Sequence, residues 1–238
     1  MRYGINVLKF IPSFCLIIMA TVHVLDSYAA ELPFSEGEKL TYEVRYKNLK
    51  VGESVLTFHG KAGLGDREVY HITFSTALVA VKDLEELYAQ TDNFLPVEVH
   101  RRIKKAGTFT TEIKEIYDQK NFRVGVHKET TLRSKDFSIQ KGSSIHNAIL
   151  LSYYYRTKGS FDKNEKLKVT LPTVDFEVFF EGEEVIETPL GEYLSYAFAS
   201  NPPKFKLWLS ADSKRIPLKI ENPSALGYSL VIKSIEYR

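Results

Sequence analysis

Hydrophobic and polar residues alternate along most of this chain of 238 residues. From residue 40 to residue 46 the order is Leu, Thr, Tyr, Glu, Val, Arg, Tyr, so every second side chain is apolar. The same period of two recurs in later segments, at 70–74, 97–104, 109–117, 166–171, 205–210, 218–221 and 228–233. Because successive side chains of a strand point to opposite faces, each segment is predicted to be a strand with one buried and one wet face.

Residues that favour turns separate these segments, as in Gly60–Gly65, Pro189–Gly191 and Asn201–Pro203. Short strands separated in this way, each polar on one face, indicate antiparallel pairing and not a parallel α/β sheet. We therefore predict a mainly β protein, built as a single curved antiparallel sheet or an open half-barrel. Residues 76–87 fit a strand end, a short helix or a flap, and no element is assigned to them.

The segment Ser143–Lys158 breaks the alternation and is predicted to be a helix. Ser143 or Ser144 can cap its start, and Gly159 can take the left-handed position after its end. Its apolar residues cover several sides, which is typical of a buried helix, so we expect the sheet to wrap around it. Arg156, near the end of the helix, is expected to form a structural ion pair or to bond backbone carbonyls.

The first thirty residues differ from the rest. A positively charged start precedes the apolar run Cys15–Leu25, and Ser27 and Ala29 fit the small positions before a signal peptidase site. The run has about 11 residues, whereas a bilayer span needs about 20. Residues 1–29 are therefore predicted to be a signal peptide cleaved near Ala29, and residues 30–238 a single all-β domain, periplasmic or secreted, with no transmembrane span. The alternative is an uncleaved anchor helix.

Charge and cysteine content exclude several classes of protein. The 32 Lys and Arg residues nearly balance the 30 Asp and Glu residues, so the chain lacks the basic field that a nucleic acid partner requires. Cys15 is the single cysteine and lies in the predicted leader, so the mature domain would contain neither a disulfide nor a thiol nucleophile.

Candidate catalytic chemistry is sparse. No G-x-S-x-G motif occurs, and no two histidines have the spacing of a zinc site. His146 is expected to make a hydrogen bond in the first helical turn and not to act in catalysis. The carboxylate pairs Glu85–Glu86 and Glu183–Glu184 are expected to be solvated. We therefore expect no catalytic residue, metal or cofactor, and the protein is predicted not to be an enzyme.

The run from His100 to Lys105 carries five basic side chains among its six residues. It is interpreted as a charged strand edge that prevents edge-to-edge pairing. The alternative is contact with anionic lipid heads or a cell-wall polymer.

Aromatic residues supply the remaining functional signal. The chain contains 14 Tyr, 15 Phe and 1 Trp. These side chains either fill a packed core or line a concave face that holds an apolar ligand. On the second interpretation the ligand-binding residues are predicted to be Tyr153, Tyr154, Trp208 and Phe180.

Four patches of the sequence resemble the bacterial exported family DUF3108. They comprise residues 34–44 with Gly52, Tyr88 and Asp92 ahead of Pro96, Tyr153–Arg156, and residues 187–193 with 207–218. The helix of that family opens with Gln-Asp and has a later Ser, where this chain has His146, Asn147 and Leu150. The resemblance implies export, an all-β envelope domain and no settled activity. The segment around Trp208 and Pro217 also resembles, at the level of fold, the LolA/LolB lipoprotein carriers, which are open half-barrels with an apolar cavity.

The expected function is that of an exported, periplasmic, non-enzymatic envelope protein that binds a hydrophobic or lipid-like molecule in a concave face. The alternative is a structural or protein-interaction module of the cell envelope that uses a strand edge or the basic run. An enzyme is the third option, and it would require a polar cluster in a cleft, such as His146 beside a carboxylate.

Overall fold

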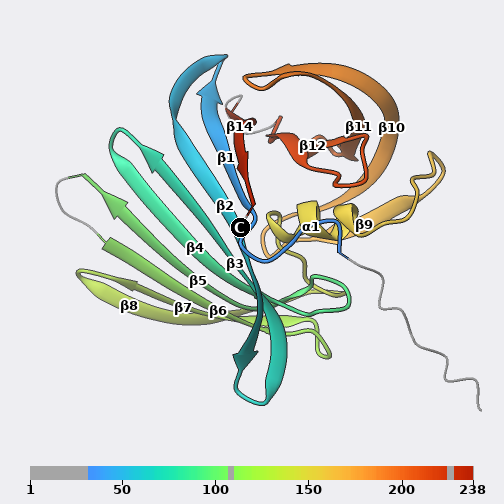
Figure 1. Ribbon diagram of the computed structural model, residues 1–238. Helices are drawn as coiled ribbons and strands as arrows, with labels where there is room; N and C mark the ends of the chain where they lie inside the picture. The colour runs from blue at the N-terminus through green and yellow to red at the C-terminus, as the bar shows by residue number, and fades with distance from the viewer. Residues whose placement is uncertain (1–31, 107–109, 224–227, 238) are drawn as a thin grey trace, which may run out of the picture. The chain divides into compact units, whose positions relative to one another are not determined.

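The eight alternating segments and six further strands pair into one antiparallel sheet in the computed structural model, which describes residues 32–106, 110–223 and 228–237 (Figure 1). The strands are β1 Lys39–Tyr46, β2 Leu49–Leu64, β3 Arg67–Leu78, β4 Val81–Ala89, β5 Pro96–Lys105, β6 Thr110–Asp118, β7 Arg123–Thr130, β8 Arg133–Gln140, β9 Lys166–Thr170, β10 Asp175–Thr188, β11 Gly191–Asn201, β12 Lys206–Ser210, β13 Pro217–Glu221 and β14 Tyr228–Glu236. Their spatial order is β8-β7-β6-β5-β4-β3-β2-β1-β14-β13-β12-β11-β10-β9. The sheet is therefore open, with β8 and β9 as its edges.

The predicted mainly β class is confirmed, and each alternating segment lies largely within a strand. Residue 109 falls outside the described residues, and β6 is described from Thr110. The unassigned segment 76–87 contains the end of β3, a tight turn and most of β4. Its pattern was ambiguous because the inner face of β4 carries the carboxylates Asp83 and Glu85 in place of apolar side chains.

The inner face of the sheet follows the apolar positions of the sequence. On β1, Leu40, Tyr42 and Val44 are buried, and Leu40 lies opposite the buried Leu56 of β2. The strands β2 and β3 approach very closely at Gly52, where an added Cβ would lie 2.3 Å from the carbonyl oxygen of Ala77. This close approach accounts for a glycine at that position.

The predicted helix is much shorter in the structure than Ser143–Lys158. The helix α1 spans Leu150–Arg156 and ends at Thr157, so Gly159 does not cap it. The segment before it is held to the end of β9, where the backbone N–H of His146 donates to the Thr170 carbonyl over 2.7 Å. The hydroxyls of Ser143 and Thr170 also lie within hydrogen-bonding distance, 2.8 Å apart. These contacts hold residues 143–146 outside the helix.

Asn147, and not Ser143 or Ser144, supports the start of α1. Its side-chain Oδ1 accepts hydrogen bonds from the backbone N–H groups of Ile149 at 2.9 Å and Leu150 at 3.4 Å. Asparagine favours helix starts because its side chain satisfies N–H groups that have no partner inside the helix.

The helix α1 packs on the concave face of the sheet, as predicted. Leu150 and Tyr153 belong to one buried apolar cluster with residues of β1–β7, β13 and β14. Leu151 and Tyr155 belong to a second cluster with residues of β9–β12. Because one short helix contacts both halves of the same sheet, the sheet must curve around it. None of the described helical residues forms a helix long and apolar enough to cross a bilayer.

Candidate ligand-binding cleft

An apolar chamber of about 590 Å³ lies between the inner face of the sheet and the segment leading into α1. Its walls include Tyr42, Leu56 and Phe74 from the first half of the sheet, and Ile149, Phe176 and Leu230 from elsewhere in the chain. Small-molecule sites in proteins are typically lined by apolar side chains and enclose about 300–1,000 Å³. The chamber is thus large enough for an alkyl chain or a small apolar ring system.

A polar chamber of about 360 Å³ adjoins it. The two chambers share Phe74, Ala148 and Ile149 in their walls, so they adjoin each other, and the pair is called the cleft below. Glu85 on β4, Arg101 on β5, and Glu115 and Tyr117 on β6 line the polar chamber, together with His146. The cleft therefore has an apolar end and a charged end.

Strand register explains why charged residues face this cleft. Glu85 lies opposite Phe74 on one side and opposite Arg101 on the other, so all three share the inner face. The Arg101 Nη2 donates to Asp83 over 2.5 Å, and its Nε lies 3.3 Å from a Glu85 oxygen. The Tyr117 hydroxyl donates to the Glu115 carboxylate.

Burial affects the ionisation of two groups that line the polar chamber. It raises the pKa of Glu85 to about 7; the Arg101 guanidinium opposes this shift, and the Asp83 and Glu115 carboxylates add to it. Burial also lowers the pKa of His146, whose Nδ1 accepts a hydrogen bond from the Thr170 backbone N–H over 3.3 Å. His146 is therefore neutral at pH 7, and its expected hydrogen bond is formed with β9 and not within the helix.

Two expectations for charged residues were wrong. Glu85 is not on a solvated surface, because its side chain is only 14 % exposed and lines the cleft. The basic run is not a strand edge, because β5 pairs with β4 on one side and β6 on the other. Arg101 belongs to the inner face, whereas Arg102, its neighbour in the chain, pairs with Glu112 on the outer face.

Tyr153 does not line either chamber. Its side chain is 1 % exposed, and its ring packs against Phe34, Phe58 and Phe94 with centroid distances of 5.0, 5.7 and 5.7 Å. These contacts place it in the packed core.

Tyr154 and Phe180 come together at a separate, small cavity of about 20 Å³. The Phe180 ring lies 5.5 Å from Phe198, and the Lys158 ammonium lies 4.8 Å from the Tyr154 ring. This volume is on the scale of a single water molecule and does not accommodate an alkyl chain.

Trp208 lies on the opposite face of β12 from Leu207 and Leu209, which belong to the second apolar cluster. Its Nε1 donates to the Glu184 carboxylate of β10, and the ammonium groups of Lys206 and Lys219 each lie 4.7 Å from its ring. The structure thus separates Trp208 from the other three residues, and none of the four contacts the cleft.

Arg156 and Glu38 form an ion pair whose two side chains are 0 % exposed. The guanidinium contacts the carboxylate at 2.5 and 2.8 Å and donates from Nε to the Lys214 carbonyl over 3.2 Å. It also stacks on the Phe34 ring at 4.5 Å. The sequence-based interpretation of Arg156 as structural fits these contacts, which join α1 to the start of β1.

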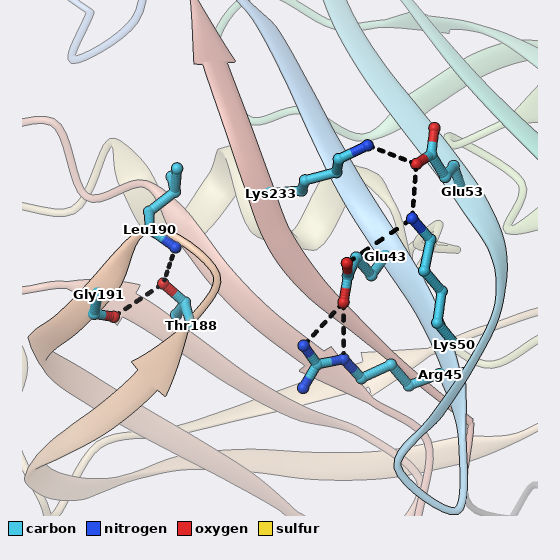
Figure 2. A network of polar contacts seen from close by, with 8 residues as sticks. All are labelled: Glu43, Arg45, Lys50, Glu53, Thr188, Leu190, Gly191 and Lys233. Carbon is cyan, nitrogen blue, oxygen red and sulfur yellow. Dashed lines mark hydrogen bonds and ion pairs between the residues drawn. The ribbon is translucent and has the colours of Figure 1, made fainter.

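Charged residues on the outer face of β14, β2 and β1 form a chain of ion pairs, Lys233–Glu53–Lys50–Glu43–Arg45 (Figure 2). Hydrogen bonds from Lys233 and Lys50 lower the pKa of Glu53 to about 2. Figure 2 also shows the β10–β11 turn, where the Thr188 hydroxyl accepts from Leu190 N–H and donates to the Gly191 carbonyl. Each of these five charged side chains on the outer face thus has at least one ion-pair partner.

Sequence reasoning missed Glu85, Arg101 and Glu115 as cleft residues. The available signal was Glu115, which occupies the position between Ile113 and Tyr117 on the inner face of an alternating strand. The described residues contain no group of three or more His, Cys, Asp or Glu side chains suited to a metal ion.

Comparison with solved structures finds a similar fold. The beta-barrel-like protein of domain of unknown function DUF1849 from Brucella abortus aligns with a TM-score of 0.50 and 8 % identity, over 85 % of this chain and 98 % of that one. At such low identity, the likeness supports the fold alone.

Two further structures align with lower scores. One is a protein described as exported, with a YmcC-like fold, from Bacteroides fragilis, with a TM-score of 0.29, 11 % identity, and coverage of 87 % of this chain and 98 % of that one. The other is described as a lipoprotein from Parabacteroides distasonis, with a TM-score of 0.31, 12 % identity, and coverage of 86 % and 98 %.

No curated protein matches the sequence. A family model described as "Protein of unknown function (DUF3108)" matches residues 41–233, which include the cleft-lining strands β2–β6. The chain therefore belongs to the DUF3108 family.

Proposed function

We propose that this protein binds a lipid-like, amphipathic small molecule in the cleft between its sheet and α1, as a non-enzymatic protein of the cell envelope. The observation that carries the proposal is the apolar chamber of about 590 Å³, which adjoins a polar chamber on the same face of the sheet. This arrangement suits a molecule with an alkyl part and a polar head. The proposal includes export and cleavage near Ala29, which lies outside the described residues.

The energy for binding would come from the removal of apolar surface from water. Each buried CH₂ group contributes about 0.8 kcal/mol, which is roughly a fourfold gain in affinity. We therefore expect affinity to rise by about that factor for each added CH₂ in a series of 1-alkanols, until the chamber is full.

A neutral fluorescent probe, 1-N-phenylnaphthylamine, and its displacement by 1-dodecanol would test the proposal. Ala148→Trp places an indole where the two chambers meet, and we expect it to abolish binding. Ala80→Trp is the matched control, because Ala80 lies in the exposed turn between β3 and β4. If the unmodified protein binds neither molecule, or if Ala148→Trp binds both as well as Ala80→Trp does, the cleft does not serve this function.

A second candidate is an interaction module that uses the edge strand β8. Seven of its eight residues are exposed, and its outer edge has no neighbouring strand in the sheet. Such an edge can pair with an extended segment of another protein. A photo-crosslinker at Ser138 should then capture a reproducible envelope partner, whereas one at Ser234 of the internal strand β14 should not. The absence of any partner specific to Ser138 would discredit this candidate.

A further inference from the structure

The polar chamber contains more acidic than basic groups. Glu85 and Glu115 line it as two carboxylates beside the single guanidinium of Arg101, which a third carboxylate, Asp83, also contacts from outside the chamber. Arg101 is already held by Asp83 at 2.5 Å and by Glu85 at 3.3 Å. Among the described residues Glu115 has no ion-pair partner, and its hydrogen bond comes from the neutral Tyr117 hydroxyl.

Other charged side chains nearby do not cancel this excess. His146 is neutral at pH 7, because burial lowers its pKa. Lys128 on β7 is the next cation along this face, in register with Ile113, but its side chain is exposed and does not line the chamber. Glu85 is only partly ionised near pH 7, because burial raises its pKa to about 7, so the charged end of the cleft is acidic mainly through the Glu115 carboxylate.

The apolar chamber contains one competing cation at its own border. Lys204 and Glu221 both line it, and Glu221 is paired with Lys219 at 2.6 Å. An anionic head would thus bind to Lys204 if the ligand lay with its head at the border of the apolar chamber and not in the polar chamber. The two ends of the cleft predict opposite head-group charges, and this difference can be measured.

We infer that the cleft selects an amphiphile with a cationic head, an alkyl chain that ends in an ammonium group. The chain would lie in the apolar chamber, and the ammonium would donate hydrogen bonds to Glu115 and Glu85. An ammonium has three donors and no acceptor, and its hydrogen bonds to carboxylates are charge-assisted. An anionic head would instead face these carboxylates while the guanidinium of Arg101 is occupied. This inference rests on the proposed function and specifies its ligand class.

Three ligands with the same twelve-carbon chain would test the inference: dodecylamine, 1-dodecanol and dodecanoate. Their displacement of 1-N-phenylnaphthylamine is measured at pH 7.5, because an alkylammonium stays protonated there as a lysine does. Dodecylamine and dodecanoate are kept below their micelle concentrations, and 1-dodecanol is kept below its solubility limit. We expect dodecylamine to bind about tenfold tighter than 1-dodecanol, and dodecanoate to bind more weakly than either.

Matched variants locate the head group. Glu115→Gln should weaken dodecylamine binding by about tenfold and leave 1-dodecanol binding unchanged, because only the charge is removed. Glu112→Gln is the control, since Glu112 lies on the same strand, faces the other way and pairs with Arg102. Glu85→Gln is a second variant of the acidic end if the circular dichroism spectrum of Glu115→Gln differs from that of the unmodified protein.

The outcomes separate the inference from the proposed function. Equal binding of the three ligands would overturn the cationic head group while leaving an apolar ligand-binding site. Tighter binding of dodecanoate that is lost in Lys204→Gln would also overturn it, and would place the head at the opposite end. If none of the three ligands, 1-dodecanol included, displaces the probe, the proposed function itself fails.

Discussion

Replacement of Arg156 by methionine is expected to destabilise the protein strongly. The variant keeps a long, flexible side chain but removes the only cation that contacts Glu38 among the described residues. Both side chains are 0 % exposed, so the Glu38 carboxylate would stay in the core without a partner. Removing one member of a buried pair typically costs about 3–5 kcal/mol, which is a large share of the roughly 5–15 kcal/mol that stabilises a domain.

The same physical argument predicts that a second substitution restores stability. In Glu38→Leu with Arg156→Met, neither charge is left in the core, and an apolar pair of similar volume replaces the ion pair. Such replacements are often neutral or stabilising by about 1–4 kcal/mol, because the desolvation of two charges is avoided. We therefore expect the free energy of unfolding of the double variant to be close to that of the unmodified protein.

Urea unfolding provides the assay. Circular dichroism follows the sheet, and the fluorescence of Trp208, the single tryptophan, reports on the region around β12. If Arg156→Met lowers the free energy of unfolding by less than about 1 kcal/mol, the assignment of a buried pair is contradicted, since such a small effect is typical of exposed pairs. A double variant at least as unstable as Arg156→Met would refute the coupling between the two charges.

Three other predictions concern the cleft and its surroundings. The pKa of Glu85 is raised from 4.5 to about 7, so its contribution to stability is present below pH 4.5 and is lost as the pH rises through 7. Glu85→Gln should thus be about 1–3 kcal/mol more stable than the unmodified protein at pH 8 and equal to it near pH 4.5. A stability difference in urea unfolding that stays constant with pH would show that Glu85 is not the group that titrates. Trp208→Phe removes the hydrogen bond to Glu184 and should lower the free energy of unfolding, followed by circular dichroism, by about 1–3 kcal/mol. It should leave the binding of 1-N-phenylnaphthylamine unchanged, and weaker binding would instead support the sequence-based assignment of Trp208 to the ligand site. Gly52→Ala should destabilise the protein by about 1–3 kcal/mol, because the added Cβ would clash with the Ala77 carbonyl. In Gly63→Ala the added Cβ meets no atom within 4 Å, so the loss of stability should be less than half as large. Equal losses would argue against the close approach of β2 and β3.

The site was harder to predict from the sequence than the fold. The aromatic residues that were singled out proved to be spread over the core, a small cavity and the opposite face of the sheet. Large aromatic side chains contribute apolar area wherever they lie, so their number does not show where space remains unfilled. The cleft is instead lined by ordinary residues such as Ile149 and Leu230 from distant parts of the chain.

The sequence by itself predicted eight of the fourteen strands and their buried faces, because the two-residue period is a local property of the backbone and can be read without knowing any partner. It also determined family membership, which the match over residues 41–233 shows. Only the tertiary structure decided which strands are neighbours, that α1 begins at Leu150, and that Glu85 and Arg101 meet inside the curved sheet. Those outcomes depend on strand register and on contacts between residues far apart in the chain, such as His146 with Thr170, and no local pattern encodes them.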